Sequence, residues 1–150
     1  MTTKEKLENF NPSMRVGGIV FRCEDEVLLF KRALHKKFGA GQWALCAGKI
    51  EGNEEYIDGV VRECFEETGI MITKDKLEYI NTYYHSPELD RNFEMEWKVF
   101  QVKVEIKPEV KLNDEHSEYK WININDVNTY DLIDGENYCL NDYFVKCNSY

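Results

Sequence analysis

Short runs of apolar and β-branched residues alternate with polar turn signals along most of the chain, a pattern typical of an α/β protein. Residues 14–22 and 27–32 flank the polar tripeptide Glu24-Asp25-Glu26, which predicts a β-hairpin. Inside the first run, Gly17-Gly18 predicts either a β-bulge or a close backbone approach. Further elements are expected as strands at 42–46, 77–84, 93–106 and 119–122, a helical turn at 125–130, and a final amphipathic helix at 136–147.

A longer helix is predicted between Asn53 as its N-cap and Gly69, where a left-handed residue would end it. Glu54 and Glu55 would then lie in the first turn, where the helix dipole favours acidic side chains. Apolar and small residues recur at helical spacing and predict a core-facing stripe, formed by Ile57, Val60, Val61, Cys64 and Thr68.

Glutamates crowd the C-terminal half of this helix. Glu63 and Glu67 are one turn apart and project within about 40° of each other, with Glu66 three residues after Glu63. Like charges at this spacing repel, and the last turn of a helix favours cations. A divalent cation would reverse both effects, because Mg²⁺ and Mn²⁺ prefer carboxylate oxygens. A solvated acidic face with Arg62 as its counter-ion explains the same residues, so the helix alone leaves both interpretations open.

The whole stretch from Gly48 to Ile70 resembles the Nudix box, the signature of the Nudix hydrolase family and its MutT-like members. Seven identities match at the family's spacing, which would occur by chance about once in 10⁸ starts: Gly48, Glu54, Arg62, Glu63, Glu66, Glu67 and Gly69. The resemblance implies an α/β/α sandwich with a mixed central sheet. We expect one such domain over residues 1–150, with 1–13 as a partly disordered lead-in.

The resemblance also implies an activity. Such an enzyme uses Mg²⁺ or Mn²⁺ to hydrolyse a phosphoanhydride bond in a nucleoside triphosphate or related nucleoside diphosphate derivative, and releases pyrophosphate and a monophosphate. In the family's arrangement, the catalytic and metal-binding roles would fall on the Gly48 carbonyl and on Glu63, Glu66 and Glu67. Arg62 would lock these carboxylates in place, and Glu54 would brace the loop against the helix.

A second resemblance lies in the C-terminal half. Glu115-His116, followed by Tyr119-Lys120-Trp121, is loosely similar to a segment of the dihydroneopterin triphosphate and dATP pyrophosphatases. Because a carboxylate engaged with Mg²⁺ is a poor base, hydrolysis profits from a further one. We therefore expect Glu115 to bind another metal or to accept the proton of the attacking water. The alternative is an acidic surface loop.

Two other functions stay open. Residues 47–51, Ala-Gly-Lys-Ile-Glu, are closer to the ADP-ribose pyrophosphatases, which favours a nucleotide-sugar substrate. A non-catalytic sensor that binds a nucleotide is the third reading. Degenerate family members usually lose one or more box glutamates, and this chain keeps all of them.

The chain carries a net charge of −9, which argues against a protein that binds nucleic acid polymers or anionic membranes. Basic residues nevertheless cluster at Lys31, Arg32, Lys36 and Lys37, as an electropositive mouth for a polyphosphate or as a solvated loop. Arg32 is the leading phosphate ligand, because its planar fork binds phosphate bidentately. Lys31 and Lys49 are the other substrate-binding candidates.

Five scattered cysteines without a CxxC pair predict buried, reduced thiols in a cytoplasmic protein. The polar first residues lack the apolar core of a signal peptide, and no run is long enough to span a membrane. The expected partner is a small nucleotide, and the family resemblance adds a possible homodimer.

Overall fold

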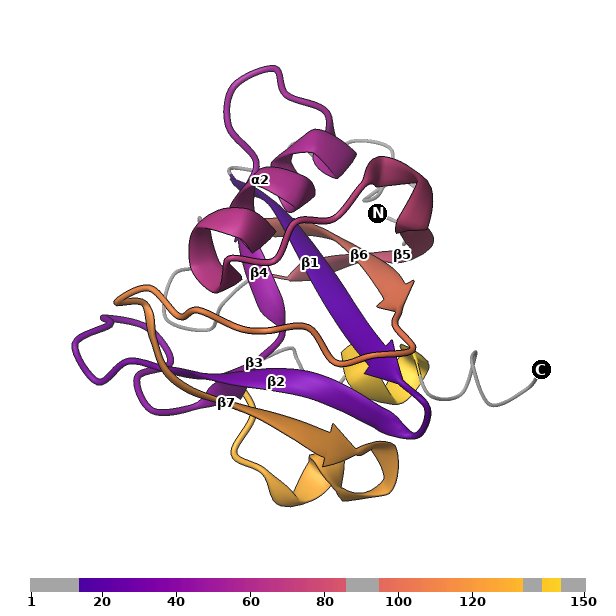
Figure 1. Cartoon of the computed structure of the whole chain (residues 1–150). Helices are drawn as coiled ribbons and strands as arrows, with labels where there is room; N and C mark the ends of the chain where they lie inside the picture. The colour runs from indigo at the N-terminus through magenta and orange to yellow at the C-terminus, as the bar shows by residue number, and fades with distance from the viewer. Residues whose placement is uncertain (1–13, 86–94, 134–138, 144–150) are drawn as a thin grey trace, which may run out of the picture.

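The computed structural model describes residues 14–85, 95–133 and 139–143. Strands and helices follow one another in the order that the alternating pattern predicts (Figure 1). The elements are β1 (Met14–Cys23), β2 (Glu26–Arg32), β3 (Trp43–Ala44), β4 (Cys46–Lys49), α2 (Tyr56–Thr68), η1 (Lys74–Lys76), β5 (Glu78–His85), β6 (Met95–Lys103), β7 (His116–Asn123) and η2 (Ile124–Thr129). Residues 139–143 are also helical.

Seven strands of the described residues form one mixed sheet in which β1 pairs parallel to β6 and the other pairs are antiparallel. Strands β1 and β2 pair only beside their shared turn, at Arg22 with Val27 and Cys23 with Glu26. Farther along, β1 pairs with β4, whereas β2 pairs with β3 and β7. The two strands therefore diverge, and β4 enters beside β1 at the point where α2 crosses.

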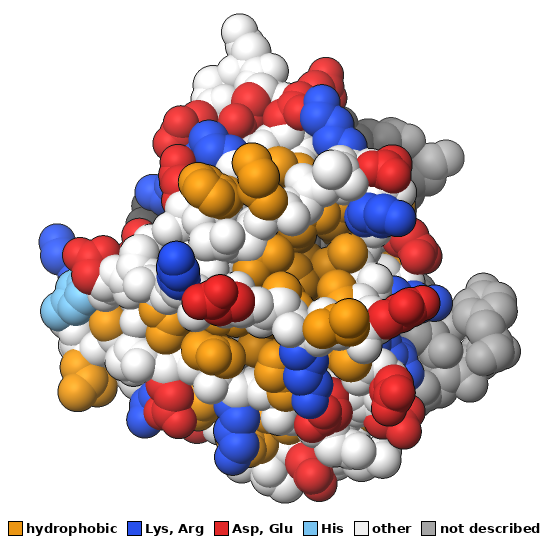
Figure 2. Space-filling model, in the orientation of Figure 1, with side chains coloured by type: hydrophobic (Ala, Val, Ile, Leu, Met, Phe, Trp, Pro, Cys, Tyr) orange, Lys and Arg blue, Asp and Glu red, His pale blue; other side chains and the backbone are white. Residues whose placement is uncertain are grey.

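The two faces of the sheet bury separate hydrophobic clusters, because neighbouring residues of a strand point to opposite sides. On one face, Val60 and Cys64 of α2 pack with Ile19, Phe21, Leu28 and Phe30. On the other face, helical residues Cys139, Leu140 and Tyr143 pack with Val16, Val20, Val27 and Leu29. The expected α/β/α sandwich is confirmed. Figure 2 shows hydrophobic side chains across the middle of one face, below α2, with charged side chains mixed around its edge.

Gly17 lets α2 lie close to one face of the sheet, and Gly18 makes room for the Trp97 side chain on the other face. The pairing of β1 is regular through Gly17 and Gly18, so the close-approach reading holds and the bulge does not. A Cβ at Gly17 would lie 2.2 Å from Cγ2 of Val60, and one at Gly18 would lie 2.8 Å from Nε1 of Trp97. The helix ends as predicted at Gly69, which has φ 72° and donates its N–H to the Phe65 carbonyl.

The start of α2 corrects one expectation. Asn53 lies in a turn, and the helix begins at Tyr56 after an extended Glu55 that makes no side-chain cap. Only Asp58 is acidic in the first turn, so Glu54 and Glu55 are not there. The reason is that the Glu54 carboxylate accepts hydrogen bonds from the N–H of Glu51, at 2.8 Å, and from the Arg62 guanidinium of the helix. These two contacts keep residues 51–55 as a loop.

Several boundaries differ from the predicted ones. The strand predicted at 42–46 is split into β3 and β4, β6 ends at Lys103 and not at 106, and β7 begins earlier, at His116. The predicted ends of the last helix lie outside the described residues, as do residues 1–13. Cys23, Cys46 and Cys64 are free and buried as expected, Cys139 is buried as well, and Cys147 lies outside the described part. In the described residues, no helix has the length and apolar composition needed to cross a membrane.

Candidate active site

Strand β4 and helix α2 meet at Gly48. A Cβ at this position would lie 2.3 Å from Cδ of Glu63, far inside van der Waals contact. The Glu63 carboxylate therefore rests directly on the backbone of β4, and only glycine leaves it room. The sequence supplied both residues, but only the antiparallel pairing of β4 with β1 brings them together.

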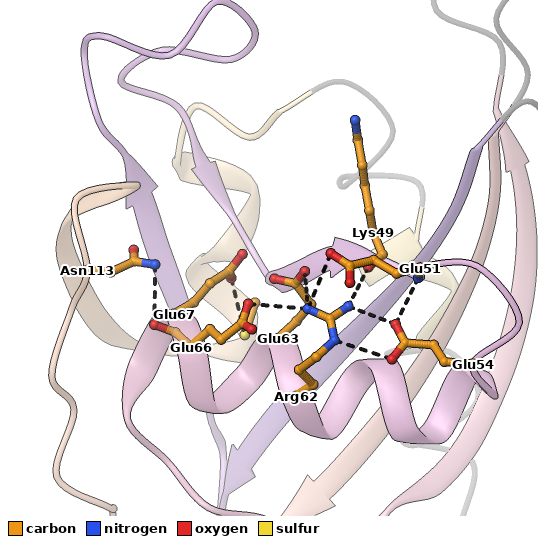
Figure 3. A network of polar contacts seen from close by, with 9 residues as sticks. Lys49, Glu51, Glu54, Arg62, Glu63, Glu66, Glu67 and Asn113 are labelled. Atoms are coloured by element: carbon orange, nitrogen blue, oxygen red, sulfur yellow. Dashed lines mark hydrogen bonds and ion pairs between the residues drawn. The ribbon is translucent and has the colours of Figure 1, made fainter.

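Arg62 is the centre of a polar network between the helix, the 51–55 loop and β4 (Figure 3). Its guanidinium donates to both Glu54 oxygens, at 2.7 and 3.3 Å, and to the Lys49 carbonyl at 3.0 Å. It also donates to Oε1 of Glu63 at 3.0 Å and to Oε2 of Glu66 at 3.2 Å. These contacts lower the pKa of Glu54 and raise that of Arg62 still further, so the guanidinium stays charged.

Glu67, unlike the glutamates bound by Arg62, lies in a buried environment beside other acidic groups. Its side chain is buried, with 3% of the residue exposed, and the Cys46 thiol donates to its Oε2 at 3.6 Å. Burial, together with the nearby Glu115 and Glu63 carboxylates, raises the pKa of Glu67 to about 9. Burial also raises the pKa of Glu63, with Glu66 and Glu115 acting in the same direction and Arg62 against it. Among the described residues, no ion pair engages Glu67.

Glu115 reaches this cluster from the segment just before β7. Asn113 joins the two parts, because its side chain donates to the Glu66 carbonyl at 3.3 Å and accepts the N–H of Glu115 at 3.0 Å. It thereby satisfies a free carbonyl at the end of α2. Sequence reasoning missed this role of Asn113. The available signal was an amide residue two positions before an expected site carboxylate.

The three predicted substrate-binding cations, Arg32, Lys31 and Lys49, have different surroundings in the structure. Arg32 donates its Nε to the Phe38 carbonyl at 3.0 Å and so holds the 33–42 loop. Lys31 lies opposite Glu118 in the β2–β7 ladder. The side chain of Lys49 is exposed and points away from the carboxylates (Figure 3). Lys36 instead lies 3.7 Å from a Glu115 oxygen, a contact that the sequence did not indicate.

The donor set fits a hard divalent cation. Its members offer carboxylate oxygens, which Mg²⁺ and Mn²⁺ prefer, and the buried Glu67 carboxylate faces other carboxylates instead of a cation. In this conformation, no three acidic, histidine or cysteine side chains of the described ranges stand close enough to enclose an ion. Arg62 holds Glu63, and Lys36 lies beside Glu115. An ion there would compete with these two side chains for their carboxylates.

Comparisons with known proteins point to one family. The NUDIX domain family matches residues 12–142 of the chain. The nucleoside triphosphatase NudI from Escherichia coli O139:H28 is 30% identical over 111 residues, which are 70% of this chain and 78% of that protein.

Two solved structures share the fold. The MutT protein from Methanosarcina mazei Go1 superposes with a TM-score of 0.77 at 24% identity, covering 93% of this chain and 98% of that one. The NUDIX domain of Shewanella oneidensis NrtR, solved with ADP ribose, has a TM-score of 0.73 at 19% identity, covering 98% and 99%.

Proposed function

The chain belongs to the Nudix family and is a Nudix hydrolase, and from this premise we propose that it hydrolyses a phosphoanhydride bond of a nucleoside triphosphate or a related nucleoside diphosphate derivative. From a nucleoside triphosphate the products would be pyrophosphate and a monophosphate, with Mg²⁺ or Mn²⁺ as the cofactor. The nucleoside triphosphatase activity in the name of NudI supports this choice of substrate.

The observation that carries the proposal is the setting of Glu67. A buried carboxyl group without a cationic partner in the described part of the chain is costly to ionise, and two further carboxylates, Glu63 and Glu115, face it. Such a site is stabilised by a divalent cation and by the anionic substrate that the cation attracts. A solvated acidic helix face would expose all of its carboxylates, and this helix does not.

The chain's residues divide into three roles in this proposal. The metal would be held by Glu63, Glu66, Glu67, Glu115 and the carbonyl of Gly48. When bound, it would neutralise charge on the non-bridging phosphate oxygens and lower the pKa of a water. Arg62 fixes the orientation of Glu63 and Glu66 through the contacts described above. Arg32, Lys31 and Lys49 are the proposed substrate-binding cations.

Proton transfer needs a carboxylate that is not fully neutralised by metal. Glu115 is our candidate, because its side chain is half exposed and comes from outside α2. It would accept the proton of the attacking water or hold another metal ion. Glu63 and Glu66, which are oriented by Arg62, are the alternative catalytic carboxylates.

A second substrate class is supported by two observations. Residues 47–51 resemble the ADP-ribose pyrophosphatases, and the NrtR domain was solved with ADP ribose. With such a substrate the bond broken is the diphosphate between two groups, and the products are two monophosphates. Binding without turnover would instead identify a nucleotide sensor.

One experiment separates these functions. The purified protein is incubated with a panel of nucleoside triphosphates and nucleotide sugars, with Mg²⁺, Mn²⁺ or EDTA, and the products are resolved by chromatography. We expect pyrophosphate plus a monophosphate with metal, and no turnover in EDTA. Two monophosphates would assign the nucleotide-sugar reaction. Full activity after metal has been stripped would contradict the proposed site.

The partner and the cellular location of the protein can be proposed from its activity and from its cysteines. We propose a small nucleotide as its partner and a cytoplasmic location, because the buried free thiols of Cys23, Cys46 and Cys64 suit a reducing compartment.

A further inference from the structure

The loop between β2 and β3 brings a lysine to the carboxylate cluster. The Nζ atom of Lys36 lies 3.7 Å from Oε1 of Glu115, with 26% and 40% of the two side chains exposed. Among the described residues, Lys36 is the cation that pairs with Glu115. The pair joins the loop to a carboxylate that raises the pKa of both Glu67 and Glu63.

The position of Lys36 is set by the fold. The backbone N–H of Ala33 donates to the Glu115 carbonyl at 2.9 Å, which ties the start of the loop to the segment before β7. The N–H of Lys36 donates to the Ala33 carbonyl at 3.2 Å, so the lysine ends a turn that begins at the residue bonded to Glu115. Arg32 closes the other side of the loop through Phe38. Lys36 therefore approaches Glu115 from an anchored backbone.

Two cations thus flank the carboxylates, and they differ in kind. Arg62 makes multiple short contacts and belongs to the network that holds α2, the loop and β4 together. Among the described residues, Lys36 makes one ion pair, at 3.7 Å to Glu115, whose side chain is 40% exposed. Exposed pairs of this kind contribute little and are easily exchanged. A lysine ammonium on a flexible stem is also a common ligand of phosphate.

We propose that Lys36 exchanges partners during the reaction. It neutralises Glu115 when no divalent cation is near, and it binds the polyphosphate of the substrate once a cation engages Glu115. This inference rests on the proposed function, and it adds a substrate-positioning residue from a loop outside the Nudix box. It predicts two opposite effects of removing the ammonium: metal binds more tightly, and polyphosphate binds more weakly.

The test compares Lys36→Ala with Lys37→Ala, which removes the same charge from the adjacent, exposed position of the same loop. Mn²⁺ binding without nucleotide is measured by electron paramagnetic resonance. Tripolyphosphate binding to the Mn²⁺-loaded protein is measured by calorimetry. Relative to Lys37→Ala, we expect Lys36→Ala to bind Mn²⁺ roughly 1.5- to 5-fold more tightly. Its affinity for tripolyphosphate should fall roughly 10-fold, and Lys36→Arg should restore both values.

The outcomes are separable. If Lys36→Ala matches Lys37→Ala in either measurement, the exchange of partners is wrong, even if the wild-type protein binds metal and hydrolyses nucleotides. If the wild-type protein binds neither Mn²⁺ nor tripolyphosphate, the proposed function fails together with this inference. Turnover of the nucleotide panel distinguishes the two cases.

Discussion

Two side chains five residues apart on α2, Arg62 and Glu67, show how strongly local surroundings decide charge. Arg62 is held among carboxylates that keep it charged. Glu67 is buried beside carboxylates that raise its pKa to about 9, so in the metal-free protein it carries a proton at neutral pH. A bound cation would favour its ionised form. The charge state of Glu67 is therefore expected to be coupled to metal binding.

The first prediction concerns the pH dependence of stability in EDTA. Below the ordinary pKa of 4.5, Glu67 is protonated in both the folded and the unfolded state, and its contribution to the stability of the folded protein is fully present. Between about 4.5 and 9 the unfolded chain loses this proton and the folded protein keeps it, so the stability falls as pH rises. The loss approaches about 1.4 kcal/mol per pH unit. We expect the Tm to decrease over this range, and Glu67→Gln to make the decrease shallower.

Glu55→Gln is the matched control, because it removes one carboxylate at an exposed position just before α2, and the change in slope is compared between the two variants. Some slope should persist in Glu67→Gln, since burial raises the pKa of Glu63 in the same direction. If plots of Tm against pH were parallel for the wild-type protein and Glu67→Gln, Glu67 would be ionised in the metal-free protein.

At the scale of the element, Arg62 explains why α2 starts where it does. Glu54 accepts hydrogen bonds from the guanidinium and from the N–H of Glu51, and so the helix begins only at Tyr56. The loop before the helix, the helix itself and the carbonyl of Lys49 in β4 are consequently fixed to one another by a single side chain.

We predict that Arg62→Lys lowers the free energy of unfolding by about 1–3 kcal/mol, because a lysine cannot make the two-pronged contact with Glu54. Urea denaturation measures the change. Glu54→Gln should cost less in the Arg62→Lys background than in the wild-type protein, since the two residues share one interaction. Activity should fall as well, because Glu63 and Glu66 lose their orientation.

The comparison for this experiment is an exposed ion pair that joins Asp58 of α2 to Lys74 of η1. Lys74→Ala should change the free energy of unfolding by no more than about 1 kcal/mol, as is usual for surface pairs. An equal effect of Lys74→Ala and Arg62→Lys, with additive Glu54→Gln, would reduce Arg62 to an ordinary surface cation.

At the scale of the whole molecule, the site is assembled from segments far apart in the chain. Pairing of β2 with β7 places the segment before His116 beside the 33–42 loop, and Asn113 links that segment to the end of α2. Glu115 arrives at Glu67 through these tertiary contacts. Its distance from the Nudix box in sequence is therefore no obstacle to a shared function.

The third prediction tests that assembly. Glu115→Gln should lower kcat by roughly 10²- to 10⁴-fold, the usual contribution of a positioned acid or base, while nucleotide binding survives. Glu118→Gln is the control, because Glu118 is an exposed residue opposite Lys31 in the β2–β7 ladder. Steady-state kinetics with the substrate found in the panel provide the measurement. Near-normal kcat in Glu115→Gln, with a large loss in Glu63→Gln, would transfer the role to Glu63.

The sequence by itself determined the features that depend on neighbouring residues. Alternating runs predicted the hairpin, the later strands and the helical turn, because strand and turn preferences are local. The stop at Gly69 followed from its freedom to adopt positive φ, and the core stripe from helical periodicity at Val60, Cys64 and Thr68. The box spacing also identified the family before any contact was known.

Tertiary structure alone decided what depends on distant segments. Helical spacing placed Glu63 and Glu67 on one side of α2, but the burial of Glu67 comes from β4 and from the segment that carries Glu115. The predicted start of the helix is wrong because the Glu54 carboxylate binds Arg62 and lies in the loop before the helix. The contact of Lys36 with Glu115 likewise follows from loop anchoring that no pattern encodes. Desolvation and charge pairing arise only where separate segments pack together, and they set the pKa values on which the proposed chemistry depends.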